Sequence, residues 1–157
     1  GADLQFGNFS ISALFQGNAQ ADRYLDGISI KPFWDDEGRD NVFANITDRW
    51  RADNPTNQDV FYPRLSVGSD GNNNNVKPSS WWVKDVSFLR LKQVNISYTL
   101  PKKWTDPLLI KNAQIYLMGT NLLTFSKFKL WDPELNTSNG TAYPNVSSYS
   151  IGLKFNF

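Results

Sequence analysis

The sequence contains no cysteine and no histidine in its 157 residues. Their absence excludes Cys nucleophiles, Ser-His-Asp triads, Cys/His zinc sites, haem ligation by histidine and disulfide scaffolding. Charges of the two signs are nearly balanced, since 16 Lys and Arg stand against 15 Asp and Glu. The net charge of +1 therefore gives no reason to propose a nucleic-acid partner. We expect a protein that is not an enzyme and carries no cofactor.

Long apolar runs are also missing. No stretch approaches the roughly 18 apolar residues of a membrane-spanning helix, and residues 1–20 have neither a basic nor an apolar region of a signal peptide. The length allows one domain at most. Any segment of this chain that lies in a membrane would therefore be a β-strand.

Apolar side chains instead recur at every second position, which indicates β-strands. The predicted strands are residues 4–16, 86–100, 112–125 and 147–157. In the last of them one face carries only apolar side chains, which are Tyr149, Ile151, Leu153, Phe155 and Phe157. The alternation changes phase near Lys92. A β-bulge at Lys92 or Gln93 would bring the apolar side chains before and after it to the same face. Alternatively, residues 81–91 project beyond the sheet.

The connections between these strands alternate in length. Residues 17–80 form a long loop, residues 101–111 a short connection, and residues 126–146 a longer one. Such alternation is typical of outer-membrane barrels, which have extended extracellular loops and short periplasmic turns. The pattern predicts an all-β fold of about four antiparallel strands from a large transmembrane barrel, with the C-terminus on the periplasmic side.

Strands that are polar on one face suit either a soluble sandwich or a barrel in lipid. Polar faces of Ser, Thr, Asn and Gln with little charge favour a hydrated lumen. Four strands cannot close a barrel, because bacterial barrels have at least about eight. The missing strands come from a longer polypeptide or from further copies, and the start at Gly1, without an export signal, favours a piece of a longer chain.

Several stretches resemble the C-terminal barrel region of SusC/RagA-like TonB-dependent transporters of Bacteroidetes. They are residues 80–101 (SWWVKDVSFLRLKQVNISYTLP), 62–65 (YPRL), 115–125 (IYLMGTNLLTF) with 132–134 (DPE), and 143–157. Their joint order is more specific than any one of them.

The resemblance implies a barrel of about 22 strands, an N-terminal plug, energy supplied by the TonB system and a SusD-like surface lipoprotein over the pore. It places the chain in the bacterial outer membrane, in contact with lipid and with the rest of the barrel. The function it implies is uptake of a glycan or a peptide. The 157 residues would supply barrel wall, extracellular loops and a terminal strand that directs insertion.

Two groups of side chains in the long loop, or directly after it, are candidate binding residues. Trp34, Trp50, Trp81 and Trp82 either stack on a substrate or partner, or pack the loop on itself. Asp35, Asp36, Glu37 and Asp40 form an acidic cluster. It is a calcium site, a pair of carboxylates for glycoside hydrolysis or a solvated loop, and the solvated loop is favoured.

Two rivals to the importer remain at this point. One is a soluble β-sandwich that binds carbohydrate, with Trp81 and Trp82 as its platform. The other is a trimeric membrane anchor in which each chain contributes four strands to one barrel.

Overall fold

A computed structural model describes residues 1–27, 30–33, 42–66 and 74–157. The chain divides into two units. The sheet unit comprises Gly1–Ala19, Ser87–Asp132 and Pro144–Phe157, and the loop unit comprises Gln20–Val86 and Pro133–Tyr143. Within the described residues no helix is both long and apolar enough to cross a membrane.

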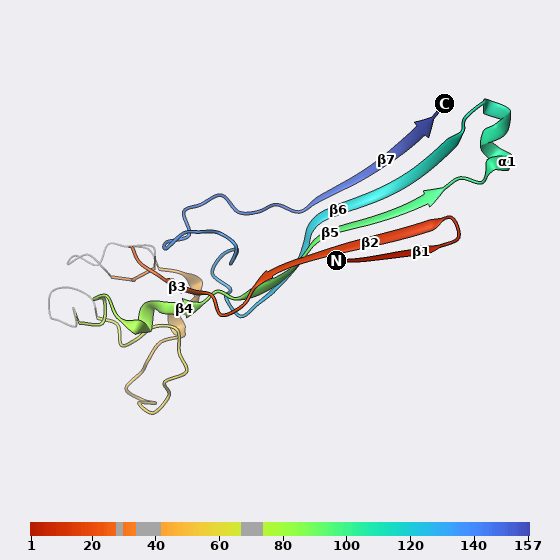
Figure 1. The fold of residues 1–157 in the computed structure, drawn as a ribbon. Coiled ribbons are helices and arrows are strands. Elements are labelled where there is room, and N and C mark those ends of the chain that lie inside the picture. Colours follow the sequence, from red (N-terminus) through yellow and green to blue (C-terminus); the bar gives the residue numbers. More distant parts are fainter. Residues whose placement is uncertain (28–29, 34–41, 67–73) are drawn as a thin grey trace. The chain divides into compact units, whose positions relative to one another are not determined.

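The sheet unit is one antiparallel sheet of five strands in the order β1-β2-β5-β6-β7 (Figure 1). The strands are β1 (Ala2–Phe6), β2 (Phe9–Asn18), β5 (Phe88–Thr99), β6 (Asn112–Ser126) and β7 (Ser148–Asn156). The predicted all-β class is confirmed. The sheet is open, because β1 and β7 each have only one neighbouring strand among the described residues.

The N-terminal segment differs from the prediction. Residues 4–16 were expected to form one strand, but a tight turn at Gly7 and Asn8 divides them into β1 and β2. Gly7 adopts a φ of 57°, which glycine allows without strain. Asn8 Nδ2 donates a hydrogen bond to the Thr99 carbonyl at 2.9 Å, which fixes the turn beside β5. The sheet therefore has five strands where four were expected.

The predicted bulge in β5 is confirmed at Lys92. Gln93 pairs with Leu14 and Leu91 pairs with Phe15, so Lys92 is an extra residue relative to β2. In β6 the same step spans Asn121 and Leu122, because Gln93 pairs with Thr120 and Leu91 with Leu123. Because of the bulge, Leu89 and Leu91 remain in β5 with their side chains on the same face as Val94 and Ile96.

The remaining elements belong to the connections. In the loop unit, β3 (Asp22–Tyr24) pairs with β4 (Val83–Asp85). The same unit contains the short 3-10 helices η1 (Ala44–Thr47) and η2 (Ser80–Trp82). In the sheet unit, α1 (Lys102–Thr105) and η3 (Asp106–Leu108) connect β5 to β6. The predicted strand 86–100 thus begins two residues later, at Phe88.

Tyr116 covers Gly152 across the β6–β7 pair. The two residues are direct partners, and a Cβ added at Gly152 would lie 2.3 Å from the Tyr116 ring. Aromatic cover of a strand glycine is a known means of fixing register.

We expect Gly152→Ala to destabilise the β6–β7 pair by about 1 to 3 kcal/mol, because the new methyl group overlaps the Tyr116 ring. In a Tyr116→Ala background the same change should cost much less, which a double-mutant cycle on the unfolding of the intact protein measures. Equal costs in both backgrounds would contradict the contact.

Candidate functional site

The register of the sheet gathers the apolar side chains on one face in continuous rows. One row runs across all five strands through Leu4, Ile11, Ile96, Leu117 and Ile151. A second runs through Phe6, Phe9, Tyr98, Ile115 and Leu153. These side chains are not buried in a core: Leu4 is 71% exposed and Ile151 is 75% exposed.

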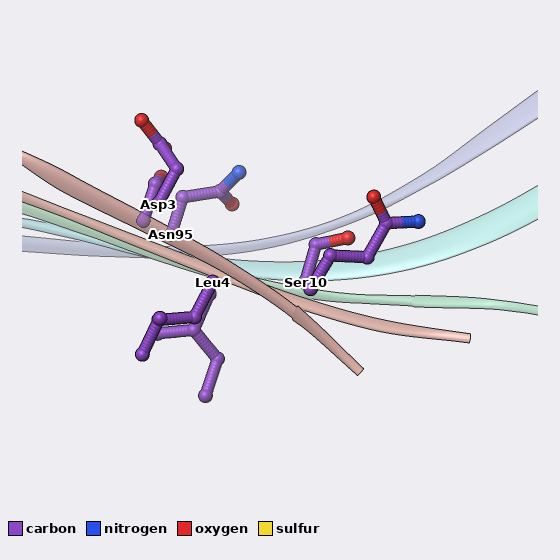
Figure 2. A pocket seen from close by; sticks show the side chains of 7 residues that line it. Asp3, Leu4, Ser10 and Asn95 are labelled. Carbon is purple, nitrogen blue, oxygen red and sulfur yellow. The ribbon is translucent and has the colours of Figure 1, made fainter. Parts of the chain in front are cut away.

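The opposite face is polar and almost uncharged. Its rows run through Asp3, Ser12, Asn95, Met118 and Ser150, and through Gln5, Ser10, Ser97, Tyr116 and Gly152. Figure 2 shows Asp3, Ser10 and Asn95 projecting to one side of the strands and Leu4 to the other. A hollow of about 400 Å³ lies here, but its lining includes residues of both faces, so it is no enclosed binding cavity.

A single sheet layer with an exposed apolar face is unfavourable in water. Burying a large apolar side chain stabilises a protein by about 1.5 to 3 kcal/mol, and this face leaves whole rows of them uncovered. Exposed apolar patches of this extent mark surfaces that contact something else. A soluble sandwich would need a second sheet across these rows, and the described residues leave the rows exposed.

The terminal strand continues the apolar face at the sheet edge. Tyr149, Ile151, Leu153 and Phe155 follow one another at every second position, and Phe157 comes directly after β7. All five are exposed. Leu153 pairs with Ile115 and Ile151 with Leu117, so the strand presents the side chains that the alternation predicts.

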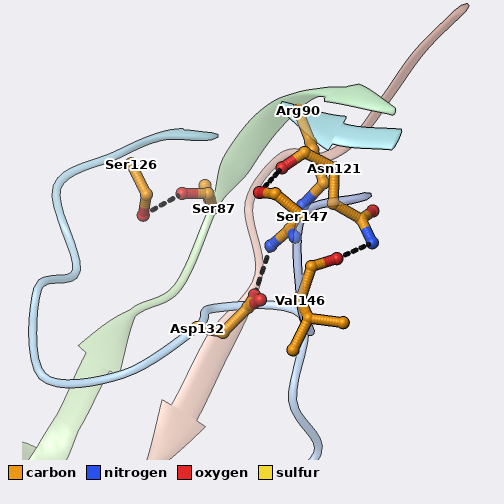
Figure 3. Close-up of polar contacts among 7 residues, drawn as sticks. All are labelled: Ser87, Arg90, Asn121, Ser126, Asp132, Val146 and Ser147. Carbon is orange, nitrogen blue, oxygen red and sulfur yellow. Dashed lines mark hydrogen bonds and ion pairs between the residues drawn. The ribbon is translucent and has the colours of Figure 1, made fainter. Parts of the chain in front are cut away.

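A group of polar contacts holds the connections at one end of the sheet (Figure 3). Arg90 and Asp132 form an ion pair, with only 3% and 11% of their side chains exposed. Ser126 Oγ donates to the Ser87 carbonyl at 2.8 Å. Arg90 and Asp132 are 42 positions apart and come from two of the stretches that carry the family resemblance. No pattern in the sequence indicates that the side chains of Arg90 and Asp132 meet.

Asn121 fastens the segment that leads into β7. Its φ of 51° lies in the left-handed region, which asparagine tolerates better than most residues. Its Nδ2 donates to the Val146 carbonyl at 3.0 Å, and its own carbonyl accepts from Ser147 Oγ at 2.6 Å (Figure 3). The irregular step in β6 thus anchors the start of β7.

The candidate tryptophans of the loop unit make backbone contacts. Trp82 is completely buried and its Nε1 donates to the Asn75 carbonyl at 3.0 Å. Trp81 donates to Phe61 at 3.0 Å and Trp50 to Pro55 at 3.1 Å, and both side chains are half-buried. Each indole therefore satisfies a carbonyl of its own loop. Trp34 lies outside the described residues.

A buried lysine organises the loop unit beside Trp82. Lys31 has no exposed surface, and its Nζ lies 2.6 Å from Asp26 Oδ1 and 3.2 Å from the Tyr24 hydroxyl. The same Nζ is 5.4 Å from the ring centres of Tyr24 and Trp82. The hydrogen bond from Lys31 lowers the pKa of Asp26 below its ordinary value. Nothing in the sequence around Lys31 marked it as buried.

Metal-binding geometry is absent from the part of the chain that the structure describes, because no three acidic side chains there lie close enough to share an ion. The acidic cluster at Asp35, Asp36, Glu37 and Asp40 lies outside the described residues.

Replacing Asp132 with alanine should open the connection that follows β6. Removing one partner of a buried ion pair costs about 3 to 5 kcal/mol, because the remaining charge loses its compensation. We expect much faster proteolytic cleavage between residues 126 and 147 in the intact protein. Asp106→Ala, at an exposed position of the same unit, is the control and should leave cleavage unchanged. Equal cleavage of both variants would rule out this role for the ion pair.

The Asp26–Lys31 pair predicts a pH dependence of the loop unit. Because the pKa of Asp26 is lower in the folded state than in the unfolded state, the pair stabilises the fold above about pH 3.8 and loses its effect as the pH falls through the folded pKa. The Leu25 amide, which donates to Trp82, should exchange faster in Asp26→Asn than in the unsubstituted protein at pH 7. The difference should vanish below the folded pKa, and a difference that persists there would contradict the assignment.

The chain is similar to known proteins over nearly its whole length. No family model matches it. TonB-dependent receptor P26 of Formosa agariphila is 32% identical over 166 residues, which cover 98% of the chain and 16% of the receptor. TonB-dependent receptor P3 of the same organism is 27% identical over 168 residues, covering 99% of the chain and 16% of the receptor.

Solved structures agree with this result. The RagAB peptide importer in its closed-closed state superposes with a TM-score of 0.70 at 25% identity, covering 94% of the chain and 16% of the importer chain. Its open-open state gives 0.65 at 26% identity, covering 96% and 16%. The chain thus spans 16% of the length of the relatives it matches. It is similar to one segment of the SusC/RagA-like TonB-dependent receptors.

Proposed function

We propose that this chain is part of the wall of an outer-membrane, TonB-dependent nutrient importer. Its apolar face contacts lipid, its polar face lines the hydrated interior, and its long connections extend outside the cell. The end of the sheet that holds α1 and Phe157 lies toward the periplasm.

The observation that carries this proposal is the pair of opposite faces on one sheet layer. Exposed apolar rows cross all five strands, and polar rows with little charge cross the other side. Transmembrane barrels have this arrangement, with apolar side chains toward lipid and polar side chains toward the lumen. This role requires no catalytic step, and the similar proteins are named as a receptor and an importer.

The open edges of the sheet require further strands. In hydrocarbon an unpaired backbone group costs several kcal/mol, so β1 and β7 each need a neighbour. We assign both neighbours to the rest of the receptor barrel, with β7 as the strand that closes it and directs its insertion. A trimer of this chain is the weaker candidate, because in the relatives the matching segment is 16% of a single longer chain.

The partners of the importer follow from the family. A plug fills the barrel, the TonB system supplies energy through that part of the receptor, and a SusD-like surface lipoprotein covers the extracellular loops. The substrate is a peptide or a glycan, and similarity to a peptide importer supports a peptide. Trp50 and Trp81, whose rings keep some exposure, are the loop residues we propose for contact with substrate or lipoprotein.

Ile151→Arg in the intact receptor tests the lipid-facing assignment. Arginine on the lipid face costs about 2 to 4 kcal/mol near the membrane centre, so we expect strongly reduced insertion. Ser150→Arg is the matched control, because Ser150 is the adjacent residue of β7 and pairs with Met118 on the polar face. Heat-modifiable mobility of the outer-membrane fraction measures insertion. Equal insertion of the two variants would overturn the assignment of the faces.

A further inference from the structure

We propose that the connection between β5 and β6 binds the headgroups of anionic phospholipids. This inference rests on the proposed function, because it requires the sheet to lie in a membrane. The surface consists of residues 101–111 with the neighbouring turn at Gly7 and Asn8 and the end of β7, and we call it the α1 end.

Positive charge is concentrated at the α1 end. Lys102, Lys103 and Lys111 are all exposed, and Asp106 is the only acidic residue within residues 101–111. The whole chain has a net charge of only +1, so this short segment is more basic than the rest of the chain. Residues 101–111 are therefore a local basic cluster in a chain whose overall charge is close to zero.

Large apolar side chains are exposed among these lysines. Trp104 is 56% exposed, Leu108 is 67% exposed and Leu109 is 86% exposed. Leu109 also has a φ of 56°, in the left-handed region where glycine or asparagine usually ends a helical turn. A strained, almost fully exposed leucine is a costly choice for a turn in water. The cost is offset where the leucine enters an apolar phase.

The neighbouring segments bring more aromatic surface to the same end. Phe6 is 88% exposed and Phe157 is 79% exposed. The Thr99 amide donates to the Asn8 carbonyl at 2.9 Å, and the Lys111 amide donates to Asn156 at 2.8 Å. These hydrogen bonds place the turn, the connection and the end of β7 side by side, as Figure 1 also shows for the sheet unit.

Aromatic and basic side chains together fit the boundary between acyl chains and headgroups. Tryptophan and tyrosine prefer this level of a bilayer, and lysine reaches outward to phosphate while its alkyl stem stays in apolar surroundings. The Lys103 Nζ lies 5.9 Å from the Trp104 ring centre, so cation and aromatic ring are adjacent. The partner is therefore a phosphate-bearing headgroup with net negative charge, such as phosphatidylglycerol, in the leaflet at this end.

The experiment measures lipid selection by the intact receptor in nanodiscs of phosphatidylglycerol and phosphatidylcholine. Enrichment of spin-labelled phosphatidylglycerol around the protein is compared with that of labelled phosphatidylcholine. Each cation near an anionic surface contributes about fivefold to association. We expect Lys102→Gln with Lys103→Gln to reduce the enrichment of phosphatidylglycerol at the protein by about tenfold or more.

Lys127→Gln with Lys129→Gln is the matched control, since both lysines are exposed and follow β6 at its other end. This pair should leave the selection unchanged. Equal loss in both double variants, or no loss in either, would overturn the inference. The unsubstituted receptor gives a second readout, because the selection should weaken as salt rises, and a salt-independent selection would contradict it.

The two proposals fail in different ways. If the unsubstituted receptor does not enter nanodiscs at all, the proposed membrane location is wrong. If it enters them but selects no anionic lipid, the location stands and the headgroup site is wrong.

Discussion

The fold depends on one constraint, which is that the apolar face of a single sheet layer must be removed from water. The five strands bring rows of large side chains to one face, and the sheet unit has no core of its own between two layers. Removal of that face from water is the largest stabilising contribution available to the unit. The surroundings that cover this face therefore decide both the stability of the sheet and its function.

The irregular positions of the sheet serve the same constraint. The extra residue at Lys92 keeps Leu89 and Leu91 on the face that Val94 and Ile96 continue. The matching irregular step in β6 contains Asn121, whose contacts hold the residues that enter β7. Arg90, on the polar side of β5, reaches Asp132. The bulge thus keeps the apolar side chains of β5 on one face, while Arg90 and Asn121 hold the connections.

The face on which a side chain lies could be predicted wherever apolar and polar residues alternate along a strand. Alternation predicts the apolar face of β7. The change of phase at Lys92 predicts either a bulge or a projecting segment, and the register of β5 confirms the bulge. The prediction of one strand over residues 4–16 is wrong, because the alternation changes phase at Gly7 and Asn8, where the chain turns between β1 and β2. Arg90–Asp132 and Lys31–Asp26 could not be predicted, because such pairs depend on how distant or irregular segments meet and have no period.

Contact between the apolar rows and lipid is the central claim, and scanning β7 with spin labels tests it most directly. The segment contains no cysteine, so single cysteines at positions 148–156 of the intact receptor can each be labelled in a bilayer. The account predicts high accessibility to oxygen at positions 149, 151, 153 and 155, and high accessibility to a water-soluble relaxant at the positions between them. Absence of this alternation, or the reverse pattern, would contradict it.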